Sequence, residues 1–290
     1  MDLSKILPLV EKPARYTGGE LNMAVKRNEE VRFVFAFPDL YEIGMSHLGG
    51  KIIYSTMNER EDTYCERVYS PWKDMEGLMR QNNIPLFSLE TKRPVKDADL
   101  FGFTLQYELC YTTVLNMIDL AGLPLLAADR TDGPFIFAGG PCTYHAEPLA
   151  PFMDFYALGD GEEELHDLIE IYKEWKKSGK ERKEFLRALA RTQGFYVPSF
   201  YDIEYFEDGR IKRITPNDES APPVALRRIV DDFENAFYPT KPVVPYIEAV
   251  HDRVMLEILR GCTRGCRFCQ AGYVYRPVRE RGVSKLCALA

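Results

Sequence analysis

The 290-residue sequence lacks any apolar run of the roughly 18–20 residues that a membrane-spanning helix needs. Its first residues lead into no long apolar stretch, so the N-terminus does not resemble a signal peptide. The sequence also has no internal repeat and no low-complexity tract. These absences exclude a repeat array and predict a cytoplasmic protein without a membrane partner.

Charge of one sign is not in large excess either. The chain has 37 Lys and Arg against 44 Asp and Glu, a net charge of −7. A chain of this balance is not a general polyanion binder, so nucleic acid as a partner has no support. The length predicts about two domains, and hydrophobic residues make up 46% of the chain, enough to bury a sizeable core.

The seven cysteines form a poor disulfide framework, because their number is odd and four fall within the last 29 residues. In a reducing compartment, clustered thiols more often bind metal or take part in chemistry. Cys65 and Cys110 lie in apolar or helical patterns, and we expect them to be buried thiols.

Strand-like and helix-like patterns alternate through residues 31–178. This alternation predicts an α/β domain with a doubly wound parallel sheet and right-handed crossovers. The expected strands are 31–37, 64–69, 99–105, 135–138 and 155–158, and the expected helices lie near 46–58, 72–81, 108–121 and 162–175.

The pattern differs on both sides of this domain. Residues 1–30 predict an amphipathic helix and a polar approach. A connector over 179–249 contains a predicted hairpin at 195–214 with an Asp-Gly turn, followed by a proline-rich extended stretch. Residues 250–290 begin another domain with a β-like run at 253–259.

A Cys-x-x-x-Cys-x-x-Cys loop follows that run, at Cys262, Cys266 and Cys269. A structural zinc takes four protein ligands, and a ferredoxin-type cubane takes four cysteinates. Three closely spaced thiolates instead suit a 4Fe–4S cluster with one iron left open. Gly261 and Gly265 would permit tight backbone around the inorganic core.

This loop resembles that of the radical S-adenosylmethionine (SAM) superfamily, including the aromatic Phe268 before the last cysteine. The resemblance implies that SAM chelates the open iron and that Phe268 lies near its adenine. It also implies a 5′-deoxyadenosyl radical that abstracts hydrogen from an unknown substrate, and an electron donor such as flavodoxin or ferredoxin. In the family the loop follows the first strand of a β/α barrel, as 253–259 precedes it here.

The segment after the first predicted strand resembles the Asp-x-His-x-x-Gly loop of cobalamin-binding domains, with Asp39, Tyr41 and Gly44. Tyr41 stands where the cobalt-ligating histidine would be, so the usual lower ligand is missing. His47 is expected to be an ordinary histidine of the following helix. The resemblance implies a cobalamin-type, flavodoxin-like fold and suggests cobalamin as a third cofactor.

Glycines at two later strand ends strengthen this resemblance. Gly139 and Gly140 follow one predicted strand, and Gly159 follows the next. Glycines at strand carboxyl ends let backbone approach a large ligand in the crevice where parallel sheets bind cofactors. We therefore expect Gly44, Gly139 and Gly159 at one edge of the sheet.

Two alternatives remain open. One is a non-enzymatic iron–sulfur electron-transfer protein, and the other is a flavodoxin-like module with a structural zinc completed by Cys287 or His251. The arginine excess over 253–285 is either a surface for cluster or anionic substrate, or a solvated face. Glu162–Glu164 are expected to complement a helix dipole.

Only 21 residues follow Cys269. A full β/α barrel needs roughly 200 residues or more, so we expect residues 250–290 to be the start of an interrupted barrel. This segment is predicted to pack loosely with exposed apolar surface, and the chain alone to be inactive as an enzyme.

Overall fold

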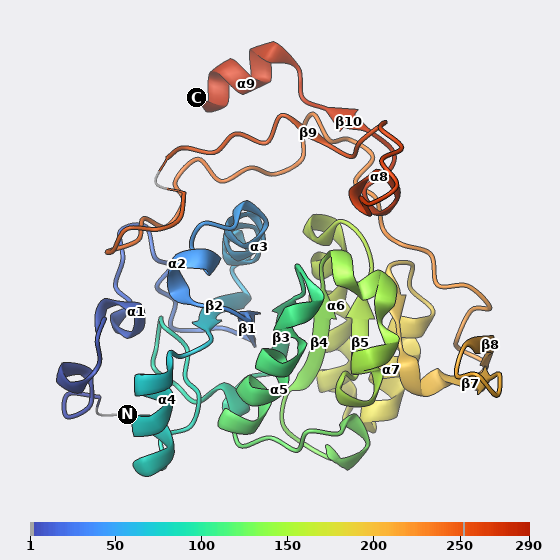
Figure 1. The fold of residues 1–290 in the computed structure, drawn as a ribbon, viewed down its shortest axis with the longest axis horizontal. Coiled ribbons are helices and arrows are strands. Elements are labelled where there is room, and N and C mark those ends of the chain that lie inside the picture. The colour runs from blue at the N-terminus through green and yellow to red at the C-terminus, as the bar shows by residue number, and fades with distance from the viewer. Residues whose placement is uncertain (1–2, 252) are drawn as a thin grey trace.

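A mainly parallel six-stranded sheet forms the centre of the protein (Figure 1). The computed structural model describes residues 3–251 and 253–290. The strand order is β2-β1-β3-β4-β5-β6, the first five strands in that order being parallel and β6 antiparallel. The order 2-1-3-4-5 is that of flavodoxin-type doubly wound sheets. The strands are β1 (Val31–Phe37), β2 (Thr63–Tyr69), β3 (Leu100–Thr104), β4 (Phe135–Gly139), β5 (Phe155–Ala157) and β6 (Phe195–Tyr196).

Helices cover both faces of the sheet, which confirms the predicted α/β class. Alternate residues of β1 point to opposite faces, so Phe33 and Phe35 enter one core and Val34 and Ala36 the other. The first core also contains side chains of α3, α6 and α7, and the second those of α4 and α5. These helices are α3 (Leu48–Glu59), α4 (Lys73–Gln81), α5 (Tyr111–Leu120), α6 (Gly161–Ser178) and α7 (Arg182–Ala190).

The sheet and its core continue beyond residue 178. Helix α7 packs against α6, and β6 pairs antiparallel with β5. The hairpin predicted over 195–214 is therefore shorter, because its first two residues belong to the central sheet. It consists of β7 (Tyr201–Tyr205) and β8 (Ile211–Pro216), with the expected Asp-Gly turn between them.

The outer strands of the sheet have partners for their free backbone groups. Beside β2, the backbone N–H of Arg67 donates to the Glu90 carboxylate at 2.6 Å, and its carbonyl accepts from Leu89 N at 2.8 Å. At the other side, Gly194 N, just before β6, donates to the Leu226 carbonyl at 2.9 Å. Loop segments thus cover both lateral edges.

The amphipathic helix predicted within 1–30 is not found in the described residues of that range. Pro8, Pro13 and the left-handed Gly18 divide the segment into η1 and α1, although its apolar residues still contact the second core. No helix of the described chain has both the length and the apolar character needed to cross a membrane. The short helices before the C-terminal segment are α1 (Ala14–Thr17), α2 (Tyr41–Gly44), η1 (Leu7–Leu9), η2 (Val95–Asp97), η3 (Glu108–Cys110), η4 (Ala127–Asp129), η5 (Pro141–His145), η6 (Glu147–Phe152) and η7 (Pro198–Phe200).

The C-terminal segment, orange and red in Figure 1, arches over one edge of the sheet. The strand predicted over 253–259 is wrong except at its last residue. Val254 is 80% exposed, so the run has no second layer against which to bury a strand. The segment instead contains β9 (Leu259–Arg260), α8 (Ala271–Val274), β10 (Arg279–Glu280) and α9 (Val283–Leu289), with β9 antiparallel to β10.

Candidate functional site

A cavity of about 380 Å³ opens at the carboxyl ends of β1, β3, β4 and β5. Doubly wound sheets bind ligands at this edge, and the volume falls within the range of small-molecule sites. Further walls come from α3, from the start of α6, and from residues 259–261 and 274–275. The cavity is therefore lined both by the sheet domain and by the segment that carries the cysteine loop.

Aromatic side chains form a flat apolar wall of the cavity. The rings of Phe33 and Phe137 are stacked with centroids 5.7 Å apart, and Phe137 stacks on Phe155 at 4.8 Å. Gly102 of β3 lies against this stack, where a Cβ would come 2.4 Å from the Phe137 ring. The wall therefore requires glycine at the middle of β3.

Two further polar side chains, Glu164 and His47, line the cavity. Glu164 is 1% exposed, and its Oε1 accepts from Leu158 N at 3.1 Å while its Oε2 has no partner within the described residues. Burial raises the pKa of Glu164 well above its usual range, which favours the protonated form of this carboxyl. His47 caps α3, with Nδ1 accepting from Gly50 N at 2.9 Å, and burial lowers its pKa. The cavity thus presents two polar groups at these positions, and burial shifts the pKa of each toward its uncharged form.

The predicted glycines lie at one edge of the sheet, as expected. Gly44 follows β1, Gly139 ends β4 and Gly159 follows β5, and the last two line the cavity together with Gly140. Gly159 has a φ of +126°, and a Cβ there would come 2.0 Å from the Arg228 carbonyl oxygen. Close approach of a neighbouring backbone segment is therefore one reason for glycine at this position.

Asp39, Tyr41 and Gly44 do not line this cavity. Tyr41 is 1% exposed, and its hydroxyl donates to Glu20 at 3.0 Å. Asp39 accepts a hydrogen bond from the Tyr107 hydroxyl in a shallow groove beside α4 and α5. The structure thus separates the cobalamin-type loop from the three cavity glycines.

The cysteine loop lies at the surface. Cys266 is exposed, Cys262 and Cys269 are half-buried, and all three thiols are unpaired. Phe268 is 93% exposed. Across residues 3–251 and 253–290, no three Cys, His, Asp or Glu side chains converge as metal ligands, and this holds for the three loop cysteines.

The donor set nevertheless fits an iron–sulfur cluster. Three thiolates close in sequence are ligands of the kind that such clusters take. Binding of the metal itself supplies free energy that gathers ligands of this kind. Cys65 and Cys110 are buried, as predicted, and burial raises the pKa of both thiols. The loop thiols are therefore the more accessible donors.

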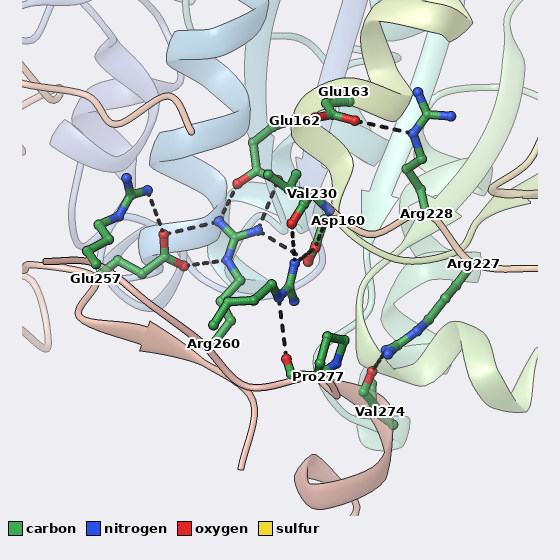
Figure 2. A network of polar contacts seen from close by, with 12 residues as sticks. Asp160, Glu162, Glu163, Arg227, Arg228, Val230, Glu257, Arg260, Val274 and Pro277 are labelled. Carbon is green, nitrogen blue, oxygen red and sulfur yellow. Dashed lines mark hydrogen bonds and ion pairs between the residues drawn. The ribbon is translucent and has the colours of Figure 1, made fainter. Parts of the chain in front are cut away.

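An ion-pair network joins the start of α6 to the residues before the loop (Figure 2). Arg260 contacts Glu162, Asp160 at 3.2 Å and Glu257 at 2.7 Å. Burial favours a raised pKa for Asp160, but the hydrogen bond from Arg279 holds that pKa below its usual range. Arg260 and Arg279 are paired with carboxylates and largely buried, so the solvated face, one of the two alternatives for the arginine excess, does not apply to them.

The run Glu162–Glu164 does more than complement a helix dipole. Glu162 binds Arg260, Glu163 lies 3.4 Å from Arg228, and Glu164 faces the cavity. Successive helical residues point about 100° apart, so three in a row must meet three environments. From the sequence, this spacing could have indicated that one of the three carboxylates faces the interior, although it does not say which one.

Comparisons with known proteins place the chain in a family. An uncharacterized protein of Methanocaldococcus jannaschii is 30% identical to this chain over 212 residues. The match covers 73% of this chain and 38% of that relative, so the chain spans well under half the relative's length. The family model described as radical SAM proteins, N-terminal, matches residues 49–198, more than half of the chain. This chain therefore belongs to the radical SAM proteins, within the family defined by their N-terminal region.

Proposed function

We propose that the chain holds a 4Fe–4S cluster on Cys262, Cys266 and Cys269 and binds SAM at the iron that no cysteine occupies. When bound, the reduced cluster and SAM supply one-electron cleavage of the sulfonium and a 5′-deoxyadenosyl radical that takes hydrogen from substrate. The Cys-x-x-x-Cys-x-x-Cys loop in a chain of this family is the observation that supports the proposal. An electron donor such as flavodoxin or ferredoxin would serve this site.

The chain's own residues provide the thiols and keep them accessible. The backbone N–H of Arg264 donates toward Cys262 Sγ at 3.4 Å, the kind of contact that a sulfur ligand accepts. Cys287 is also exposed, but it lies on α9 outside the loop. This difference makes Cys287 a matched control for the three proposed ligands.

The cavity is proposed to hold a second ligand, for which the N-terminal resemblance suggests cobalamin. Its place at the carboxyl edge of the sheet and its flat aromatic wall support a large cofactor with a flat apolar part. The cavity volume suits one part of such a cofactor. Tyr41 is buried elsewhere, so no side chain from that position would reach cobalt.

Anaerobic reconstitution tests the cluster. We expect iron and sulfide, not zinc, to remain on the chain after gel filtration, and added SAM to perturb the paramagnetic spectrum of the reduced cluster. Cys266→Ala should lose the cluster, since two thiolates cannot hold the open-site form, whereas Cys287→Ala should keep it. Zinc in place of iron, or a full cluster in Cys266→Ala, would refute the proposal.

Retention of hydroxocobalamin tests the second ligand separately. Gly139→Leu is a suitable block, because a Cβ there has no neighbour closer than 3.8 Å and the longer side chain would enter the cavity. We expect visible absorbance of cobalamin to stay with the wild-type chain on gel filtration and to be lost in the variant. Equal retention by both would place cobalamin outside this cavity, and no retention by either would reject it as a ligand.

A further inference from the structure

The cysteine loop has a two-stranded stem. Strands β9 and β10 pair antiparallel, with Arg260 opposite Arg279, and residues 261–278 run between them. All three proposed cluster ligands lie in that interval. The position of the loop is therefore set by whatever holds the stem.

Backbone contacts close the base of the loop. Gly261 has a φ of +95°, and a Cβ there would lie 2.7 Å from the carbonyl oxygen of Tyr275. On the other side of the stem, Arg281 N donates to the Ile258 carbonyl at 2.9 Å. The two ends of the loop are thus fixed to each other directly beside the first cysteine.

Side chains then fix the stem to α6. Both terminal nitrogens of Arg260 contact Glu162, one of them at 3.1 Å, and a further contact reaches Asp160 at 3.2 Å. Arg279 also binds Asp160, and it donates to the Val230 carbonyl at 3.0 Å. The Arg260 side chain is 12% exposed, so these contacts are only weakly screened by solvent. Figure 2 shows the carboxylates of Asp160 and Glu162 directed at the stem.

A buried phenylalanine supports the same arginines from another element. The guanidinium carbons of Arg281, Arg260 and Arg279 lie 4.5, 5.1 and 5.9 Å from the centre of the Phe233 ring. Arg281 also donates to the carbonyls of Glu234 and Ala236 at 3.2 and 3.0 Å. Cation–π contacts add to the ion pairs, so the stem is held in one defined position on the sheet domain.

We propose that Asp160 and Glu162 are positioning residues for the cysteine loop, which they hold against the rim of the cavity through Arg260 and Arg279. The same two carboxylates line the cavity, and Arg260 precedes Cys262 by two residues. One pair of side chains therefore links the ligand cavity to the loop. The meaning of this link for catalysis rests on the proposed cluster, whereas the link itself concerns residues of the chain alone.

Amide hydrogen exchange of the cluster-free full chain tests the link. In Arg260→Gln and Glu162→Gln we expect exchange of peptides spanning 256–263 and 276–283 to rise about tenfold, because an ion pair with limited solvent access has lost one partner. Exchange of β1, β3 and β4 should not change. Arg260→Lys, which keeps the charge but not the two-pronged contact, should fall between wild type and Arg260→Gln.

Arg80→Gln is the matched control. Arg80 contacts Glu76 at 3.0 Å and Asp119 at 2.9 Å on the α4 and α5 side of the sheet, away from the stem. It should leave stem exchange unchanged. A uniform rise across the sheet in Arg260→Gln would reveal only general destabilisation, and unchanged stem exchange would show that the carboxylates do not hold the loop; either result overturns the proposal.

Reconstituted protein extends the test to the cluster. We expect iron loss to a chelator to be about tenfold faster in Glu162→Gln than in wild type or Arg80→Gln. This factor matches the expected rise in amide exchange of the stem. Equal rates in all three would overturn the positioning role. If the wild-type chain takes up no cluster while stem exchange still rises in Glu162→Gln, the proposed function fails and the link between rim and loop stands.

Discussion

Glu164 gives the sharpest test of the cavity's electrostatics. Its carboxyl is buried, one oxygen accepts from Leu158 N, and the other has no partner among the described residues. Burial raises its pKa in the folded state, opposed by the Leu158 N–H and the charge of Arg228, whereas Asp160 and Asp167 raise it further. The folded protein therefore retains a proton that the unfolded chain releases above pH of about 4.3.

The sign of the pH dependence follows directly. A raised carboxyl pKa gives stability that is fully present below the unfolded pKa and is lost as the pH rises toward the folded pKa. Across that interval, the free energy of unfolding of wild type relative to Glu164→Gln should fall by about 1.4 kcal/mol per pH unit. Glutamine keeps an oxygen for Leu158 N and carries no charge, so the variant should be the more stable protein at pH 8.

Urea unfolding at pH 5, 6, 7 and 8 measures this difference. Glu163→Gln is the matched control, because Glu163 is the neighbouring residue of α6 and its side chain is half exposed. The difference in free energy of unfolding between wild type and Glu164→Gln removes the titration of all other groups. The same difference for Glu163→Gln should change little with pH. Parallel stability curves for wild type and Glu164→Gln over this range would refute the claim that burial raises the pKa of Glu164 in the folded state.

Three further changes are predicted from the structure. Arg67→Met leaves the buried carboxylates of Glu20 and Glu90 without their cation and should cost about 3–5 kcal/mol in urea unfolding, whereas Arg80→Met, at an exposed pair, should cost under about 1 kcal/mol. Similar losses in both would contradict this account of the Arg67 pairs. Gly159→Ala places a Cβ 2.0 Å from the Arg228 carbonyl at a φ of +126°, so it should lower stability by about 2 kcal/mol or more and increase amide exchange at 226–230. An unchanged melting temperature would show that the Arg228 backbone can move away from the new Cβ at little cost in stability. Gly77→Ala, in α4 with no atom within 4 Å of the new Cβ, should instead stabilise the protein by roughly 0.5–1 kcal/mol, measured in the same unfolding assay.

The central sheet was predictable because its strands are short apolar runs between clear turn signals. The run at 31–37 is buried throughout, and its two sets of alternate residues enter two different cores. The run at 253–259 has similar apolar character but forms a strand only at its end. Local pattern alone cannot tell these cases apart, because the difference lies in whether other elements cover the run.

The site was predictable only where chemistry depends on local spacing. The spacing of the three cysteines predicts a set of metal ligands before any fold is known. The partners of Arg260 at Asp160 and Glu162 lie about a hundred residues away, and no local pattern relates them. The place of Glu164 in the cavity was not predicted for another reason. Acidic residues in a first helical turn already have an ordinary explanation in the helix dipole.

The covered edges of the sheet bear on how the chain behaves at high concentration. An open strand edge offers unpaired backbone groups to other chains and seeds intermolecular sheets. Here the Glu90 side chain and the Leu89 backbone occupy the β2 edge, and Leu226 meets the chain beside the short β6. Strand addition at these two edges of the central sheet should therefore be disfavoured, so self-association of the folded protein through this sheet should depend on side chains.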